Sequence, residues 1–356
     1  MTIPLRYGPT GSNPVVRCGR GRFRIETAYD VPVRIPSVVL KSVGFIGEFT
    51  DEDSAGLGGD LCATGFFVSI PFKSPELWSN RICYFVTASH VAKELSDKLI
   101  YFLVNKRGGG VIGLEPVGDT WGVHPTDRTT DVAIIHVENQ ANSDITTINV
   151  NDLITTEHLQ KEVVGVGDEV FVTGLFTEAP GTSRNMPIVR HGNIAMIPDG
   201  QIQTDLGYAD VYLVEARSIG GLSGSPVFVR PSIEVNVDEG RLHASGPIKL
   251  LGLMQGHWDI KESEMNEPSI VHNRKRGVNL GIGVVVPAIK IIETINGPRM
   301  VEMRGEYEAI VLHHEKKKST PGNDMATPRN KKKENFTRQD FEEALKKASR
   351  KTESKS

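Results

Sequence analysis

Short runs of β-branched and aromatic residues fill the chain from about Val31 to Pro287, and they constrain its fold more than any other feature. Gly, Pro, Asn or Asp separates each run from the next, which is typical of strands joined by turns. The runs are SVVLKSVGFIG, TGFFVSI, ICYFVTA, IYFLV, DVAIIHV, DEVFVTGLF, VYLVEA, SPVFV, KLLGLMQ and GIGVVVP. Few long helical patterns lie between them, so the sequence predicts an all-β fold of closed barrels or a sandwich.

The length of the chain and its composition indicate how these strands are organised. With 356 residues, of which 38% are hydrophobic and 24% charged, the chain has an ordinary globular composition, which excludes wholesale disorder and a fibrous repeat. We expect an N-terminal extension over residues 1–39, which is rich in Gly, Pro and Arg, and a folded domain over residues 40–298. The segment PAIKIIETI spaces its isoleucines three or four apart, which predicts a short amphipathic helix closing that domain.

The C-terminal tail differs in charge from the rest of the chain. Residues 315–356 hold 13 Lys and Arg against 7 Asp and Glu, so the tail carries +6 and residues 1–314 carry −9. We expect a basic, flexible linker over residues 299–335 and a short amphipathic helix over residues 336–352, which could dock on a protein partner. The two Lys-Lys-Lys clusters could contact phosphates, but aromatic residues are not interleaved with them and the body is acidic. A nucleic-acid partner is therefore not expected.

Cysteine usage bears on the compartment and on cofactors. Cys18, Cys62 and Cys83 are an odd number with no CxxC pair, so we interpret them as free thiols and expect neither a disulfide framework nor a metal site. No cofactor is implied. The start of the chain lacks an apolar signal core, and no window reaches about 18 uninterrupted apolar residues, so we expect no membrane span. The sequence predicts a cytoplasmic location or another reducing compartment.

The segment with the most specific chemistry is GGLSGSPVF at 220–228. Acyl transfer needs a hydroxyl presented at a sharp turn and backbone N–H groups aimed at a developing oxyanion, and flanking glycines permit both. Ser223 would be the nucleophile, and the N–H groups of Gly221 and Ser223 would form the oxyanion hole. The alternative is a glycine-rich turn that happens to contain a serine.

A serine nucleophile needs a base and a group that orients the base. His90 follows the strand-like run CYFVTAS, and Asp131 opens the apolar run DVAII, so both stand where a β-run meets a turn. Taken singly, His90 could be structural and Asp131 could cap its strand. The sequence therefore supplies all three groups in the order His90, Asp131, Ser223, separated by 41 and 92 residues.

This order and spacing resemble the chymotrypsin-like serine peptidases. TGFFV at 64–68 and VTASHV at 86–91 resemble the strand before the histidine and the histidine motif of that family. GGLSGSPVF is similar to the serine motif of bacterial glutamyl endopeptidases, while VGDEVFVTG at 166–174 and GIGVVVP at 281–287 resemble the bacterial HtrA (Deg) proteases. The resemblance covers roughly residues 40–298. It does not include a PDZ domain, because only 58 residues follow Pro298 and many are charged.

The resemblance implies two packed six-stranded β-barrels with a cleft between them. The first barrel would supply His90 and Asp131, and the second would supply Ser223. It also implies that His90 takes the Ser223 proton and passes it to the leaving amine, while Asp131 orients the imidazole. The expected activity is a serine endopeptidase acting on a polypeptide substrate.

The resemblance also places a substrate pocket. Arg217 and Ser218 would lie at its base, with Met254, Gln255 and Gly256 on the opposite wall. An inward Arg217 would favour an acidic side chain before the cleaved bond. Glutamyl endopeptidases have a histidine where this chain has Met254, so an apolar pocket with Arg217 facing solvent is the other interpretation.

A second class of function is also consistent with the sequence. A chymotrypsin-fold binding module, catalytically latent, could hold a peptide in its cleft and a partner at its tail. The presence of His90, Asp131 and Ser223 together favours the enzyme, because a binding module has no need of all three.

Overall fold

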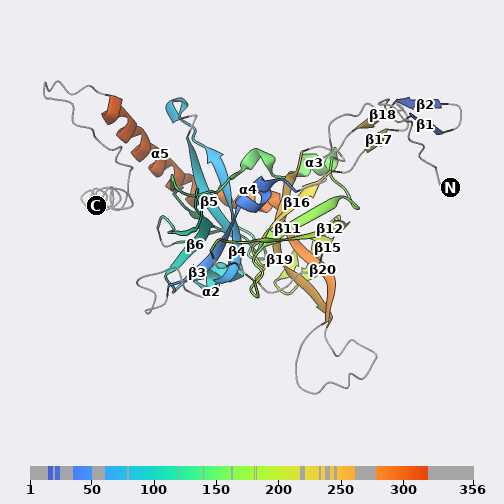
Figure 1. Cartoon of the computed structure of the whole chain (residues 1–356), viewed down its shortest axis with the longest axis horizontal. Coiled ribbons are helices and arrows are strands. Elements are labelled where there is room, and N and C mark those ends of the chain that lie inside the picture. The colour runs from blue at the N-terminus through green and yellow to red at the C-terminus, as the bar shows by residue number, and fades with distance from the viewer. Residues whose placement is uncertain are drawn as a thin grey trace, which may run out of the picture.

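Two β-sheets packed against each other form the body of the molecule, as Figure 1 shows. The computed structural model describes residues 15–18, 21–24, 35–49, 61–77, 80–118, 120–138, 140–161, 163–179, 181, 183–216, 221–231, 234–236, 241–243, 247–260 and 278–319. The expected helix at 336–352 lies outside the described residues. So does most of the expected N-terminal extension.

The first sheet has eight strands, and its core is aromatic. The strands are β3 (Val43–Glu48), β4 (Leu61–Pro71), β5 (Arg81–Thr87), β6 (Ile100–Asn105), β7 (Val111–Leu114), β8 (Gly122–Val123), β9 (Ala133–His136) and β10 (Ile148–Asn149). They run in the order β7-β6-β3-β4-β5-β9-β8, with β10 paired to β4. Phe85 lies at the centre, with its ring 3.9 Å from that of Phe102 and 5.2 Å from that of Phe67. A side chain at Gly65 would overlap the Phe85 ring, so this glycine makes the aromatic packing possible.

The second sheet closes into a six-stranded barrel. Its strands are β11 (Glu169–Gly174), β12 (Ile188–Met196), β15 (Tyr212–Glu215), β16 (Pro226–Arg230), β19 (Lys249–Ile260) and β20 (Val278–Pro287), in the order β11-β12-β15-β20-β19-β16. Its interior is mainly aliphatic, with Val170, Val172, Val214 and Leu251 fully buried. This barrel confirms the predicted all-β architecture. The first sheet differs from the prediction in having eight strands rather than a closed set of six.

The remaining strands form two smaller sheets. One is the hairpin of β13 (Ile202–Thr204) and β14 (Gly207–Ala209). The other joins β1 (Val15–Cys18) and β2 (Gly21–Arg24) to β17 (Glu234–Asn236) and β18 (Arg241–His243), in the order β1-β2-β18-β17.

The helices are short except at the C-terminal end. They are α1 (Ser37–Lys41), α2 (Ser89–Glu94), α3 (Thr156–Gln160), α4 (Ala288–Ile295) and α5 (Pro298–Ser319), with 3₁₀ turns η1 (Pro75–Leu77) and η2 (Val150–Asp152). Helix α4 is the predicted closing helix. The expected flexible linker at 299–335 is wrong over residues 299–319, which are helical. Met300, Met303, Tyr307 and Val311 recur every three or four residues and pack on the first sheet, and this contact stabilises the helix.

A shared hydrophobic cluster joins the two sheets. Phe171, Phe228 and Leu250 of the barrel belong to the same buried cluster as Phe66 and the other aromatic side chains of the first sheet. Full burial of such a side chain contributes about 1.5–3 kcal/mol. The interface between the halves is therefore fixed by packing, and it sets the relative position of groups carried on either side.

Two further observations concern the cysteines and the membrane. Cys62 and Cys83 are both free thiols, as predicted. Within the part of the chain that is described, no helix combines the length and apolar character that a membrane crossing requires.

Candidate active site

His90 lies in the first turn of α2, directly after β5. The strand ends at Thr87, the extended Ala88 precedes the helix, and His90 is its second residue. The sequence suggested a histidine at a strand end, and the structure refines this to a strand-to-helix turn. The imidazole is partly open, with 38% of the side chain exposed, so one edge of the ring reaches solvent.

Asp131 holds His90 at two points. It lies two residues before β9, and its side chain is fully buried. One carboxylate oxygen accepts from His90 Nδ1 at 2.7 Å, and the other accepts from the His90 backbone N–H at 2.9 Å. The Ser89 hydroxyl donates to the second oxygen at 2.9 Å. These three bonds fix the orientation of the imidazole ring and leave Nε2 directed away from the carboxylate.

The contact between His90 and Asp131 shifts the pKa of each group. The hydrogen bond to Asp131 raises the pKa of His90 above 6.5, although burial opposes that rise. Burial alone would raise the pKa of Asp131, but the hydrogen bonds from His90 and Ser89 outweigh it, and the pKa lies below its usual value. Asp131 is therefore ionised at neutral pH, and it stabilises a charged imidazole.

Ser223 lies on a tight turn that enters β16. Gly221 and Gly224 have φ values of +89° and +83°, in the region that favours glycine, so the turn needs both residues. A side chain at Gly224 would overlap the Thr64 carbonyl oxygen and Thr87 Oγ1, and it would lie 3.2 Å from the Ala88 nitrogen. The serine turn of the second barrel is thus pressed against the residues that lead into His90.

Thr64 of β4 connects this turn to the rest of the site. Its hydroxyl donates to the Gly221 carbonyl at 2.6 Å and accepts from the Leu175 N–H at 2.9 Å. Its backbone N–H donates to the Ser223 carbonyl at 3.4 Å, and its carbonyl accepts from Thr87 Oγ1 at 2.8 Å. The sequence placed Thr64 in a family-like motif but gave it no role. Its contacts identify it as a positioning residue for the turn that carries Ser223.

The hydroxyl of Ser223 has a partner other than His90. It donates to the carbonyl oxygen of Gln255 at 3.2 Å, and among the described residues no hydrogen bond joins it to the imidazole. The turn itself is anchored to the same strand, because the Gly224 N–H donates to the Met254 carbonyl at 2.9 Å. The structure therefore brings His90 and Asp131 into direct contact, with the Ser223 turn beside them.

The residues expected to form the substrate pocket fall into two groups. Arg217 and Ser218 lie outside the described residues. Met254 is buried in the barrel core, where its methyl group packs close to Gly283, while Gln255 and Gly256 are partly exposed on β19. Of the expected wall, Gln255 and Gly256 are thus the residues that reach the surface.

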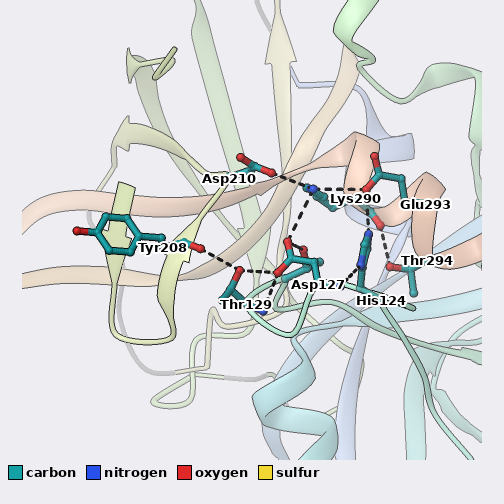
Figure 2. Close-up of polar contacts among 9 residues, drawn as sticks. His124, Asp127, Thr129, Tyr208, Asp210, Lys290, Glu293 and Thr294 are labelled. Carbon is teal, nitrogen blue, oxygen red and sulfur yellow. Dashed lines mark hydrogen bonds and ion pairs between the residues drawn. The ribbon is translucent and has the colours of Figure 1, made fainter. Parts of the chain in front are cut away.

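The loop before Asp131 is held by its own side chains and by the second barrel. Asp127 accepts from the Thr129 N–H at 2.9 Å and from the Thr130 hydroxyl at 2.8 Å. Figure 2 shows Thr129 reaching from this loop to the Tyr208 carbonyl of β14, at 3.2 Å. Burial opposes ionisation of Asp127, but these hydrogen bonds outweigh it and lower its pKa.

Lys290 of α4 joins this loop to the second barrel. Its ammonium lies 2.9 Å from Asp210, 3.5 Å from Glu293 and 3.8 Å from Asp127, at the centre of Figure 2. Glu293 also pairs with His124, at 2.9 Å. Burial opposes the charge on Lys290, but the hydrogen bond to Asp210 and the attraction of Glu293, Asp210 and Asp127 together outweigh it and raise the pKa of Lys290. The cluster joins the loop before Asp131 to α4 and to the segment that holds Asp210. These three segments are distant in the sequence, so residue spacing does not reveal the cluster.

The structure also bears on metal binding at this site. Within the described ranges, no group of three or more His, Cys, Asp or Glu side chains is arranged to hold a metal ion. The chemistry available to His90, Asp131 and Ser223 is that of proton transfer and nucleophilic attack.

Comparison with known proteins finds only distant structural likenesses. No protein-family profile and no curated protein sequence matches the chain. Among solved structures, the MamO protease domain from Magnetospirillum magneticum is 17% identical, with a TM-score of 0.43, and the match covers 72% of this chain and 96% of that one. Deg5 is 14% identical, with a TM-score of 0.39 and coverage of 72% and 88%. The HtrA-type protease AlgW is 16% identical, with a TM-score of 0.41 and coverage of 73% and 65%.

The chain itself has the closed six-stranded barrel packed on a second β-sheet that an all-β double-barrel prediction requires in part. At these identities and TM-scores the likeness assigns no function to this chain. The role of each residue depends on the geometry of this chain.

Proposed function

We propose that the chain is a serine endopeptidase in which Ser223 is the nucleophile, His90 the general base and Asp131 the group that orients it. The observation that carries the proposal is the 2.7 Å contact between His90 Nδ1 and a fully buried Asp131 carboxylate. Because a carboxylate only accepts, the proton lies on Nδ1 and leaves Nε2 as the base. This is the tautomer that a serine hydroxyl needs.

The reaction follows from this tautomer. As Ser223 Oγ attacks the substrate carbonyl carbon, its proton passes to His90 Nε2, and the carbonyl oxygen becomes an oxyanion near the N–H groups of Gly221 and Ser223. When the tetrahedral species collapses, Nε2–H gives the proton to the leaving amine and an acyl-enzyme forms. Water then repeats the sequence and releases the acid. Asp131 stays ionised and stabilises the imidazolium at each stage.

The proposed reaction requires the Ser223 hydroxyl to leave the partner that it has in the structure. Ser223 donates to the Gln255 carbonyl, so its side chain must turn about the Cα–Cβ bond to donate to His90. Catalytic hydrogen bonds commonly tighten only when substrate is bound. We propose that the peptide substrate lies over the serine turn and beside the partly exposed Gln255 and Gly256, with Arg217 and Ser218 at the base of the pocket.

The test is covalent labelling of the full chain by a fluorophosphonate probe under reducing conditions. Wild type is expected to be labelled, and Ser223→Ala and His90→Ala are expected to abolish labelling. Ser225→Ala is the matched control, because Ser225 lies on the same turn but is buried, and its hydroxyl has no hydrogen-bond partner among the described residues. His191→Ala, at an exposed histidine, is the control for His90. Labelling of the Ser223→Ala variant at the wild-type rate would contradict the proposal.

The hydrogen bond from Ser223 to Gln255 favours a second candidate, a catalytically latent binding module with a protein partner at the tail. The same experiment separates the two. Folded wild-type protein that stays unlabelled, with or without peptide, would support the latent module. Labelling that peptides slow by competition would support the enzyme. A cytoplasmic or other reducing compartment remains our prediction for either candidate, because the cysteines are odd in number and Cys62 and Cys83 are free.

A further inference from the structure

Helix α5 lies across the first sheet and leaves a pocket of about 340 Å³ beneath it. The pocket lies against β5 and β9, the strands that lead to His90 and follow Asp131. Its floor includes Tyr84 and His136, which are paired across those strands. Ile82, Val117, Met300 and Met303 give it a largely apolar wall. None of the proposed catalytic residues lines this pocket, so it is separate from the active site.

The hydroxyl of Tyr84 in this pocket lies near the Arg304 guanidinium, and among the described residues no group accepts its proton. Only 1% of the residue is exposed, and its oxygen is buried. A buried hydroxyl whose proton has no acceptor is costly, so native proteins leave few of them unless a ligand or an ordered water completes the site. The hydroxyl therefore points to something that occupies the pocket.

Arg304 brings a positive charge to the same pocket. It is 5% exposed, and its guanidinium donates to the Ile295 carbonyl at 3.1 Å and to Asn296 Oδ1 at 3.3 Å, both neutral acceptors at the end of α4. Among the described residues it forms no ion pair with a carboxylate. A guanidinium has five N–H donors, so these two bonds leave donors for another acceptor. A buried cation that meets only neutral oxygens favours an anion nearby.

The remaining polar groups of the pocket do not supply that anion. His136 is buried against the Tyr307 ring, with the centroids 4.4 Å apart, and burial lowers its pKa to about 4, so it is neutral at pH 7. Glu302 and Glu306 also line the pocket, but both are exposed on α5 and remain hydrated. The pocket thus combines an apolar wall, a hydroxyl donor and an uncompensated guanidinium.

We propose that this pocket binds a small apolar carboxylate, whose carboxylate accepts from Arg304 and Tyr84 while its hydrocarbon part packs on Met300 and Met303. Ligand pockets range from about 300 to 1,000 Å³, so this one is at the small end and suits a medium-chain fatty acid or an aromatic acid. Charge-assisted bonds from a guanidinium to a carboxylate are the stronger kind of hydrogen bond, and they give the site its preference for an acid over an alcohol.

The experiment is calorimetric titration of the full chain with octanoate and with benzoate, and with 1-octanol as the uncharged comparison. At least one acid is expected to bind saturably at one site per chain, and at least about tenfold more tightly than 1-octanol. Tyr84→Phe and Arg304→Gln are each expected to weaken that binding about tenfold. Tyr101→Phe is the matched control, because Tyr101 is equally buried in the same sheet but does not line the pocket.

A second measurement separates a ligand site from a structural role. Tyr84→Phe is expected to change the thermal midpoint of the unliganded chain little, because the hydroxyl that it removes donates to no acceptor among the described residues. Arg304 caps α4, so a loss of stability in Arg304→Gln would leave the Tyr84→Phe titration to decide. No saturable binding of either acid, equal binding of 1-octanol, or unchanged binding to folded Tyr84→Phe would each overturn the proposal and indicate a pocket filled by water.

Discussion

The two halves of the candidate site differ in how far their side chains are already oriented for catalysis. In the first sheet, Asp131 is fully buried and holds His90 by two hydrogen bonds, so the proposed base is already oriented. In the second barrel, the Ser223 turn is firmly anchored, but its hydroxyl donates to Gln255 rather than to the imidazole. Orientation of the base and presentation of the nucleophile are therefore separate properties here, and they can be perturbed one at a time.

The largest effect on catalysis is expected from a substitution that weakens the contact between Asp131 and His90. Asp131→Asn keeps the shape of the side chain but removes the charge and disfavours the proton on Nδ1. We expect the rate of fluorophosphonate labelling, and kcat/KM for peptides, to fall about 10⁴-fold, as for the equivalent change in other serine triads. Asp144→Asn, at a carboxylate that pairs with Lys41, is the control and should change neither rate. A fall of less than about tenfold in Asp131→Asn would mean that the pair is structural.

The second half is tested at Thr64. Thr64→Val removes the hydroxyl and leaves the Gly221 carbonyl and the Leu175 N–H without that partner. We expect the free energy of unfolding in urea to fall by about 1–3 kcal/mol. The labelling rate should fall about tenfold, with the pH profile of His90 unchanged. Thr64→Ser keeps the hydroxyl and should restore both properties; if it does not, the lost methyl group rather than the hydrogen bonds is responsible.

The link between the halves is tested at Lys290. Lys290→Met would leave Asp127, Asp210 and Glu293 close together without their shared cation. We expect a loss of about 1–2 kcal/mol in the free energy of unfolding, because the ammonium is mostly buried and joins several charges. Lys161→Met removes an exposed pair with Glu157 and should cost no more than about 0.5 kcal/mol. Equal losses in the two variants would show that the cluster does not tie the segments together.

The smallest effect is expected from pH alone. Because Asp131 raises the pKa of His90, the labelling rate should rise with pH to a midpoint above 6.5, where the imidazole loses its proton. In Asp131→Asn the residual rate should have a lower midpoint. The sign for stability is opposite: the raised pKa contributes to stability fully below about pH 6.5, and that contribution is lost as the pH rises through the folded-state value. Wild-type and Asp131→Asn profiles with the same midpoint would contradict this assignment.

The sequence predicted the strands and the order of the site residues because both depend on short local patterns. Short runs of β-branched and aromatic residues predicted the strands. Glycines around Ser223 indicated a tight turn, and the positive φ values of Gly221 and Gly224 confirm it. The contact between His90 and Asp131 was expected from resemblance, and the structure brings the two side chains together.

What the sequence missed depends on contacts between distant segments. Lys290 meets Asp127 and Asp210, and no spacing rule connects those positions. Thr64 was visible in its motif, but its hydroxyl has a role only once the Gly221 carbonyl lies opposite it. Helix α5 was taken for a linker because its lysine-rich end obscured the apolar stripe that begins at Met300, and that stripe is stable only against the first sheet.

The bridge from Thr64 to the Ser223 turn has a consequence for the order in which the protein is made. His90 and Asp131 lie in the first 136 residues, on strands that a ribosome completes before the second barrel has been synthesised. The serine turn comes later, and its anchor on β19 later still. The full site is therefore present only after the second barrel has been synthesised and has closed.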